Sequence, residues 1–392
     1  MNAKIKELAA AVIGDVVKWR RTIHQNPELS FKEFQTIAFI IKELSALKNV
    51  EITQPTPTSA KVIVNGAHPG KTVALRADID ALPICENSGE TFSSKNADIM
   101  HACGHDANTA MLMGAVKCAS EISDQLKGRL VFIFQHAEEL PPGGAIELVK
   151  ADVLKGVDMI FAIHCEPALP TGTIAYHNPT HSAAVTNFEL TIKGRGAHGA
   201  SPQDAVDPII IGSEIVNVLQ TIVSRRIAPN KVPVITVATF MANGSYNIIP
   251  PTAYLSGTMR THHADVREKM EQEFEKTVKG ITEIYGADYD LKFIRGYPVG
   301  INSQKAVDVL KQSYDKFLTP DYKLQLLPEA SYGGEDFAYY QQKVDGCFAY
   351  IGSGHKDFDK KAMLHTPYFK LDEDALTVGV SLHLALIYDL LV

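Results

Sequence analysis

The sequence predicts an α/β fold: a mainly parallel sheet sandwiched by helices, with an inserted α+β domain of ferredoxin-like type. Continuous apolar runs alternate with helical stretches, which is typical of parallel strands covered on both faces. The middle of the chain changes to the order β-α-β-β-α-β, the ferredoxin-like arrangement. A chain of 392 residues is also too long for one small domain, so two domains are expected.

Helices open the chain. Residues 1–21 have an amphipathic pattern interrupted by Asp15, which predicts a helix rather than a signal peptide. In "NPELSFKEFQTIAFIIKELSAL", Ser30 and Glu33 have the spacing of a capping box before a second helix. No stretch approaches the roughly 18 to 20 apolar residues that span a membrane, so no membrane partner is expected.

Four apolar strands are each followed by polar residues. "KTVALRADID" ends in Asp78 and Asp80, "RLVFIFQHAEE" in two glutamates, and "DMIFAIHCEP" contains His164 near its end. "CFAYIGSG" is followed by a loop that holds His365, and helices are expected over 108–122 and 143–149. Because sites in parallel α/β folds form at the carboxyl ends of strands, these side chains are expected to lie together.

The inserted domain is expected over residues 182–295. "AAVTNFELTIKG", "VPVITVATFMA", "TAYLSGTMRT" and "DYDLKFIRGYP" are expected strands. One helix begins at Pro208 after Asp207 as N-cap, and a second carries apolar residues at helical spacing from Val266 to Ile281. Strand-end polar residues resume after this segment. The outer domain is therefore expected to be discontinuous, over 1–181 and 296–392.

Composition narrows the class of partner and compartment. The formal net charge is −7 and no basic run stands out, so no nucleic-acid partner is expected. The five cysteines are odd in number and scattered, which argues against a disulfide scaffold. A reducing compartment fits this pattern, and a cytoplasmic location is expected.

Four segments supply side chains that can bind metal. They are Cys103 with His105, Glu138 with Glu139, His164, and His365. Thiolate, imidazole and carboxylate together suit a borderline transition metal such as Zn, Co, Ni or Mn. The paired glutamates suggest that one binds metal while the other accepts a proton from the attacking water. Asp80 and Asp106 can act as outer acceptors that orient the histidines.

Each of these motifs has alternatives when it is considered by itself. A single Cys-x-His, a glutamate pair or a histidine on an apolar strand is more often structural than functional. Cys103 could also be a nucleophile, with His101 or His105 as its base. A non-catalytic metal-binding or partner-binding protein is a further alternative. The coincidence of four segments at strand ends favours a metal centre.

Eight motifs together resemble the M20 metallopeptidase family, over nearly the whole chain. They are "RADIDALPI", "MHACGHD", "FQHAEE", "AIHCEP", "GRGAHGASP", "GTMR", "GEDFAYY" and "LHTPYFKLDE". The resemblance is closest to the amidohydrolase branch, which includes aminoacylases, hippurate hydrolases, auxin-conjugate hydrolases and N-acetyl-diaminopimelate deacetylases. It implies a catalytic α/β domain with two divalent metal ions and an inserted domain that acts as lid and dimer contact.

The resemblance also implies a role for each residue. Cys103 takes the place of a bridging ligand, Glu138 matches the general base, and Asp78 stands where the wider family has a histidine ligand. The other implied ligands are His105, Glu139, His164 and His365. Mn²⁺ or Zn²⁺ is expected, with Ni²⁺ or Co²⁺ as further candidates.

In the inserted domain, the resemblance implies a transition-state role for His198, in its own subunit or in that of a partner. Asn247 and Arg260 are expected to face the substrate carboxylate, which suits the planar fork of arginine. Two positions depart from the usual motifs of the branch, Asn108 and His136. Substrate preference therefore cannot be copied from the family.

The predicted activity is hydrolysis of the amide bond of N-acyl-L-amino acids by metal-activated water. Alternatives on the same scaffold are a dipeptidase or aminopeptidase, and an N-acetyl-diaminopimelate deacetylase. The expected partners are a small N-acyl amino acid and further copies of this chain, in a homodimer or higher homo-oligomer.

Overall fold

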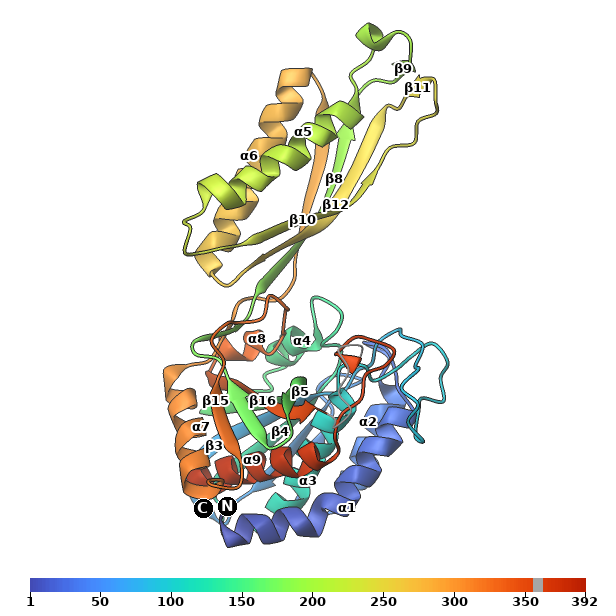
Figure 1. Ribbon diagram of the computed structural model, residues 1–392. Helices are drawn as coiled ribbons and strands as arrows, with labels where there is room; N and C mark the ends of the chain where they lie inside the picture. The colour runs from blue at the N-terminus through green and yellow to red at the C-terminus, as the bar shows by residue number, and fades with distance from the viewer. Residues whose placement is uncertain (355–361) are drawn as a thin grey trace. The chain divides into compact units, whose positions relative to one another are not determined.

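The computed structural model describes residues 1–354 and 362–392 (Figure 1). They form two compact units, which we call the sheet domain and the inserted domain. The sheet domain comprises Met1–His181, Ile301–Glu329 and Asp336–Val392. The inserted domain comprises Ser182–Gly300 and Ala330–Glu335, and the segment 182–295 expected from the sequence falls within it.

An eight-stranded sheet forms the centre of the sheet domain, in the order β1-β2-β4-β3-β5-β16-β6-β15. The four central strands β4, β3, β5 and β16 run parallel to their neighbours in that group, while β1, β2 and β6 introduce antiparallel pairs. The predicted mainly parallel α/β class is therefore confirmed. The strands are β1 (Glu51–Thr53), β2 (Ala60–Asn65), β3 (His68–Asp78), β4 (Lys127–Gln135), β5 (Met159–Pro170), β6 (Thr173–Tyr176), β15 (Lys323–Leu326) and β16 (Asp345–Gly354).

Alternate residues of the central strands enter two separate cores. In β4, Leu130, Phe132 and Phe134 face one core, while Val131 and Ile133 face the other. All five are fully buried. This is the geometry of a strand covered on both faces, since successive side chains point to opposite sides.

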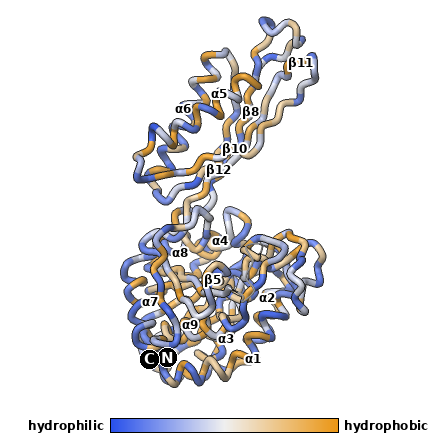
Figure 2. The backbone as a smooth tube through the Cα atoms, viewed as in Figure 1, coloured by the Kyte–Doolittle hydropathy of each residue, from blue (hydrophilic) through white to orange (hydrophobic). Residues whose placement is uncertain are grey.

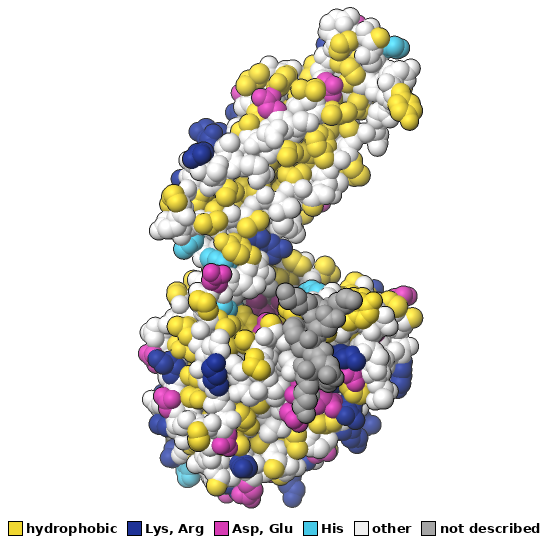
Figure 3. All heavy atoms as spheres, in the orientation of Figure 1, with side chains coloured by type: hydrophobic (Ala, Val, Ile, Leu, Met, Phe, Trp, Pro, Cys, Tyr) yellow, Lys and Arg dark blue, Asp and Glu magenta, His cyan; other side chains and the backbone are white. Residues whose placement is uncertain are grey.

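Helices cover both faces of this sheet. The larger core packs against α1 (Ala3–Gln25), α2 (Phe34–Ser45), α3 (His105–Glu121), α7 (Gln304–Phe317) and α9 (Asp374–Leu391). The smaller core packs against α4 (Gly144–Lys150) and α8 (Ala338–Gln341). Figure 3 shows Lys and Arg interspersed with Asp and Glu over the visible face of this domain.

Helix α9 corrects one expectation. By length and composition it is apolar enough to cross a membrane, although no such stretch was expected from the sequence. The helix is 72% buried inside the protein, and its central residues pack in the larger core. A core helix packed between other elements is apolar for that reason.

The start of α2 differs from the predicted capping box. Its N-cap is Glu33, and the hydroxyl of Ser30 donates instead to Asp80. The first backbone N–H groups of the helix are capped by Glu28, whose carboxylate accepts from Gln35 and Thr36 at 2.9 and 2.8 Å. The capping-box prediction was wrong because a carboxylate five residues upstream fills that role.

The inserted domain has a four-stranded antiparallel sheet in the order β10-β12-β8-β13. With its two helices this is the ferredoxin-like arrangement expected from the sequence. The main elements are β8 (Ala184–Lys193), α5 (Pro208–Thr221), β10 (Val234–Met241), β12 (Thr252–Thr261), α6 (Ala264–Tyr285) and β13 (Asp288–Arg295). Figure 2 shows hydrophobic and hydrophilic residues alternating along α6, whose Val266, Met270, Phe274, Val278 and Ile281 enter the core.

Short elements complete the chain. A two-stranded sheet joins β9 (Ala197–His198) to β11 (Ile248–Ile249), and a second joins β7 (Thr180–Ser182) to β14 (Gly300–Ile301). A 3-10 turn spans Pro202–Asp204, and a π-helical turn at Ile222–Arg226 continues α5.

Candidate metal centre

The Cys103–His105 loop leads directly into α3. The helix was expected to begin near Asn108, but it begins at His105, so this side chain lies on a rigid element. Gly104 precedes it with φ +84°, where an added Cβ would lie 3.2 Å from the Cβ of Cys165. Glycine therefore permits both the left-handed backbone and the close approach to β5.

The sulfur of Cys103 belongs to two groups of candidate ligands. One group contains Cys103, His105 and His164, and the other contains Cys103, Glu139 and His365. Within each group the ligand atoms lie within 4.8 Å of one another. The Sγ of Cys103 lies 3.6 Å from Nε2 of His164 and 3.2 Å from Nε2 of His365. The structure thus brings the other four predicted ligands together around the sulfur of Cys103.

Glu138 lies beside this cluster. It forms a further group with His105 and Glu139, again with ligand atoms within 4.8 Å of one another. Its side chain is buried, with 6% exposure. A carboxylate in this position can accept a proton close to both groups of ligands.

Asp80 orients two of the candidate ligands. Its carbonyl oxygen and its Oδ1 lie 3.0 and 3.2 Å from Nδ1 of His105, so Nε2 of that histidine is the nitrogen left for a metal. Its Oδ2 accepts the backbone N–H of Glu139 at 3.0 Å. His164 is oriented in the same way, because its Nδ1 lies 2.8 Å from the carbonyl oxygen of Cys165.

Asp78 is held by a buried network of ion pairs and hydrogen bonds beside the candidate ligands. Arg76 pairs with Asp78 and with Asp336, each at 2.8 Å. Asn108 donates to Asp78 at 2.9 Å and accepts the backbone N–H of Cys165 at 3.1 Å. The asparagine that departs from the usual motif of the branch therefore joins α3 to the strand that carries His164.

Several pKa shifts reflect the density of charge in this site. Burial opposes a charge on His105, but Asp78 and Asp80 outweigh it and raise its pKa to about 10. Burial lowers the pKa of His164 to about 4. Burial, followed by the charges of Glu139 and Glu138, raises the pKa of the Cys103 thiol well above its usual value. Burial opposes the charge of Asp80 as well, but the hydrogen bond from His105 keeps its pKa below the usual range.

The donor set fits divalent cations. Among the described residues, Nε2 of His105 is buried without a hydrogen-bond partner, and the buried Oε1 of Glu139 has Nε2 of His365, another candidate ligand, 3.2 Å away. Buried polar atoms without partners are costly, and Nε2 of His105 is held beside the other candidate ligands by the first turn of α3. A cation would satisfy Nε2 of His105 and Oε1 of Glu139, and it would stabilise the thiolate form of Cys103.

Asp106 has partners other than the proposed ligands. Its Oδ2 accepts from Nε of Arg20 at 2.8 Å and lies 2.9 Å from Nδ1 of His24. Within residues 1–354 and 362–392, no hydrogen bond joins it to a proposed ligand. The buried carboxylate pairs with α1, which packs against α3 and brings a guanidinium to it.

The other predicted residues lie in the inserted domain. His198 is exposed and pairs with Ile248 in the β9–β11 pair, and the carbonyl oxygen of Asn247 accepts the N–H of Gly199 at 2.8 Å. Arg260 lies on β12, half-buried, with Nε donating to Thr258 at 3.2 Å. His198 thus lies on β9, and Asn247 lies in the turn immediately before the paired strand β11.

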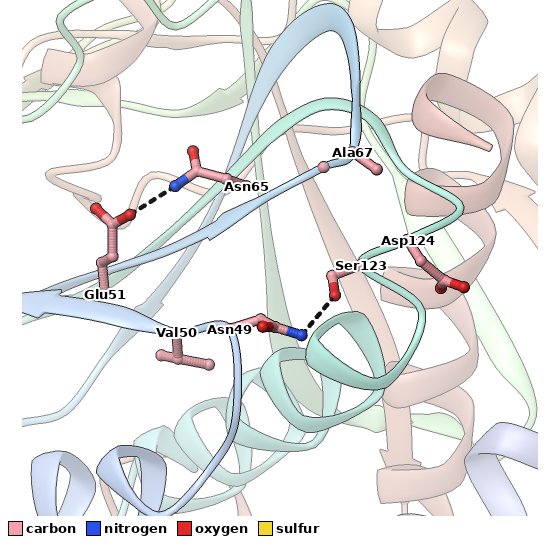
Figure 4. Close-up of a pocket in the computed structure, with 8 residues that line it drawn as sticks. Asn49, Val50, Glu51, Asn65, Ala67, Ser123 and Asp124 are labelled. Carbon is pink, nitrogen blue, oxygen red and sulfur yellow. Dashed lines mark hydrogen bonds between the residues drawn. The ribbon is translucent and has the colours of Figure 1, made fainter.

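A separate pocket lies beyond the C-terminal end of α3, whereas the candidate ligand His105 begins that helix. Its volume is about 430 Å³, and it is lined by residues that include Asn49, Glu51, Asn65 and Ser123 (Figure 4). Asn49 donates to Ser123, and Asn65 donates to Glu51. These side chains satisfy one another, and none of them is a proposed ligand.

Arg76 and Asp336 were missed by the sequence reasoning. Their ion pair joins residues 260 positions apart, and no local pattern signals it. Arg76 lies in the motif "RADID" and Asp336 in "GEDF". The sequence signal for this ion pair was therefore limited to a charged residue beside apolar ones in each motif.

Comparisons with known proteins agree with this geometry. The family model described as "Peptidase family M20/M25/M40" matches residues 74–389. The chain is 44% identical to an N-acyl-L-amino acid amidohydrolase from Geobacillus stearothermophilus, over 76% of this chain and 81% of the relative. It is 38% identical to an N-acetyl-L-cysteine deacetylase from Bacillus subtilis, over 91% and 83%.

A solved structure is also similar. The chain resembles a Bacillus subtilis protein described as a dinuclear metal binding peptidase from the M20 family, with a TM-score of 0.82 and 33% identity. The match covers 97% of this chain and 98% of that one. The resemblance recognised in the sequence is confirmed, and the chain belongs to peptidase family M20/M25/M40.

Proposed function

We propose that this protein hydrolyses the amide bond of N-acyl-L-amino acids, using two divalent metal ions. The observation that carries the proposal is the sharing of the Cys103 sulfur by two ligand groups, with Glu138 beside them. The names of the amidohydrolase and deacetylase relatives support amide hydrolysis as the reaction. The solved dinuclear relative supports two ions.

In this proposal each ion has a defined ligand set. Cys103, His105 and His164 would hold one ion, and Cys103, Glu139 and His365 would hold the other. The mixed thiolate, imidazole and carboxylate donors suit Mn²⁺ or Zn²⁺, and also Ni²⁺ or Co²⁺. When bound, such ions polarise the scissile carbonyl and make water a stronger nucleophile at neutral pH.

The protein's own side chains carry the proton steps. Glu138 accepts a proton from the attacking water and returns it to the nitrogen of the leaving amine. His198 donates a hydrogen bond to the oxygen on which negative charge develops. Arg260 and Asn247 bind the carboxylate of the amino acid and set the position of the amide.

The geometry disfavours Cys103 as a nucleophile. A nucleophilic cysteine needs a lowered pKa, whereas burial here raises the pKa of the thiol. Its sulfur also lies between candidate ligands from three other segments. The position among candidate ligands suits a bridging group, and a bound cation would stabilise its thiolate form.

A second candidate is peptide hydrolysis on the same scaffold, because the solved relative is described as a peptidase. A dipeptidase or aminopeptidase substrate carries a free amine where an N-acyl amino acid carries an acyl cap. Comparison of an N-acetyl amino acid with a dipeptide of the same residue separates the two. N-Acetyl-diaminopimelate belongs in the same panel because it tests the deacetylase alternative.

The inserted domain is proposed to act as lid and dimer contact. Its sheet ends at β10, an edge strand with Val234, Phe240 and Met241 exposed. An edge of this kind can pair with the same strand of a second copy. A homodimer or higher homo-oligomer in the cytoplasm is part of the proposal, and sedimentation of the purified protein tests its oligomeric part.

The main experiment is a hydrolysis screen over acetyl, benzoyl and longer acyl amino acids. Activity should be lost with chelator and return with Mn²⁺ or Zn²⁺. Glu138→Gln should lose turnover while keeping both ions, and Glu121→Gln at the exposed end of α3 is the matched control. Substantial turnover in the Glu138→Gln variant would contradict the assignment of the general base.

A further inference from the structure

We propose that Glu33 is a positioning residue, which holds the backbone of Ala137 and thereby aims Glu138 and Glu139 at the metal centre. The inference rests on the proposed function, since it takes Glu138 as the base and Glu139 as a ligand. Glu33 precedes α2 and belongs to none of the ligand groups. It acts on the site through the backbone of Ala137.

One oxygen of Glu33 accepts hydrogen bonds from two residues that have left-handed backbones. The side chain is fully buried, and its Oε1 accepts the backbone N–H of Phe31 at 3.0 Å and that of Ala137 at 2.8 Å. Both residues have left-handed backbones, with φ +65° and +52°. This conformation is unfavourable for residues other than glycine, so it persists where the surroundings hold it.

The strained residue lies immediately before the proposed base. Ala137 is fully buried, and its carbonyl oxygen accepts the N–H of Gly144 at 3.2 Å. Both polar groups of its backbone are therefore occupied, one of them by Glu33. Without that acceptor the N–H would be buried without a partner, and the peptide would turn to recover one.

Two carboxylates hold the backbone on either side of Glu138. Glu33 accepts the N–H of the preceding residue Ala137, and Asp80 accepts the N–H of the following residue Glu139 at 3.0 Å. Asp80 thus holds the peptide that follows Glu138, while Glu33 holds the N–H of Ala137, one peptide further back, and both constrain the backbone from which the Glu138 side chain projects. Small displacements at such a position lower turnover strongly, because the reacting groups need close alignment.

The residues around Glu33 strengthen this connection. Ser30 donates to Oδ2 of Asp80 at 2.6 Å, the same oxygen that receives Glu139. The ring of Phe31 packs edge-on against His136, with centroids 5.5 Å apart. Residues 30–33 are therefore connected to residues 136–139, just after β4, directly by Glu33, indirectly through Asp80, and by the ring contact of Phe31.

The test compares three substitutions of Glu33. Glu33→Gln keeps an oxygen acceptor at the same reach, and burial raises the pKa of Glu33 to about 8, so the neutral amide is a close mimic near pH 7. Glu33→Leu removes the acceptor. Glu33→Asp keeps the carboxylic acid but withdraws it by about 1.5 Å, which takes it out of hydrogen-bonding range of Ala137.

Two readouts are needed. We expect kcat to fall about 100-fold in the leucine and aspartate variants, with KM within about twofold of wild type. Mn²⁺ titration of the metal-free protein by calorimetry should show about tenfold weaker binding of one ion, because Glu139 is displaced. The glutamine variant should match wild type in both measurements.

A second substitution checks the backbone argument. Ala137→Gly in the Glu33→Leu background should recover part of kcat and of Mn²⁺ affinity, because glycine adopts this φ without strain. Glu28→Leu is the matched control, since it removes another carboxylate that accepts backbone N–H groups, at the start of α2. It should lower the melting temperature and leave kcat within about twofold.

Wild-type kcat and Mn²⁺ affinity in a folded Glu33→Leu or Glu33→Asp variant would overturn the proposal. Equal losses in the glutamine variant would overturn it too. If the leucine variant does not fold, the aspartate and glutamine variants decide the question. The Mn²⁺ titration remains informative even if no acyl amino acid is hydrolysed, so failure of the proposed function is distinguishable from failure of this inference.

Discussion

Asp80→Asn is a sensitive test of how the metal centre is organised. Both carboxylate oxygens of Asp80 act as acceptors: Oδ1 receives Nδ1 of His105, and Oδ2 receives the N–H of Glu139 and the hydroxyl of Ser30. An asparagine has only one oxygen. Whichever way its amide turns, an NH₂ group must face an N–H donor, so one of the two candidate ligands loses its hydrogen bond to this side chain.

The expected magnitude follows from that loss. A buried hydrogen bond to a charged group contributes about 2 kcal/mol, which corresponds to a factor of about thirty. Outer partners of metal ligands commonly change metal affinity or activity by about 10- to 100-fold, which agrees. We therefore expect Asp80→Asn to lower both Mn²⁺ affinity and kcat about thirtyfold.

The assay is calorimetric titration of the metal-free protein with Mn²⁺, followed by kinetics on an N-acetyl amino acid. Asp158→Asn is the matched control, because its carboxylate also accepts a backbone N–H, that of Thr72, but at the opposite end of the strands. The control should stay within about twofold of wild type. Unchanged Mn²⁺ affinity and kcat in Asp80→Asn would refute the argument that Asp80 orients the ligands.

Three further predictions test other parts of the structure. Cys103→Ser should lower the affinity for both ions by about 100-fold or more, and a purified serine variant with full metal content would contradict the shared ligand. His383 is buried without a partner among the described residues, and burial lowers its pKa to about 3. Since the unfolded side chain titrates near pH 6.5, the contribution of His383 to the free energy of unfolding is greatest above that pH and falls below it. The wild-type free energy of unfolding should therefore decrease by about 2 kcal/mol more than that of His383→Leu between about pH 7.5 and 5, as measured by denaturant unfolding. Phe274→Ala, which removes a fully buried ring packed 4.6 Å from that of Phe188, should destabilise the inserted domain by about 3–5 kcal/mol in calorimetry. The same variant should leave Mn²⁺ binding unchanged, and a lost metal site would show that the two units do not fold as separate cores.

Much of the fold was predictable because its signals are local. The apolar runs of β3, β4 and β5 and the helical spacing in α6 reflect burial on both faces or on one face, and such patterns can be read from neighbouring residues. The start of α2 was not predictable in this way. Its cap comes from Glu28, outside the usual capping spacing, and Ser30 is drawn away by Asp80.

The same distinction between local and long-range signals applies to the candidate site. Cys103, His105, Glu139, His164 and His365 could be proposed from the sequence, because metal binding restricts the choice of side chain and parallel strands gather their ends. The partners of Asp106 could not be foreseen. Arg20 and His24 reach it from a helix more than eighty residues earlier in the chain.

The sequence by itself determined the types of strand and helix, the family, and the residues able to bind metal. Only the tertiary structure decided that two ligand groups share Cys103, and that Glu33 and Asp80 accept the backbone N–H groups of the residues before and after Glu138. The physical reason is that residue chemistry and periodicity are local properties, while hydrogen bonds between distant segments depend on how the helices and the sheet pack. Positioning residues act through such contacts, so their roles became visible only in three dimensions.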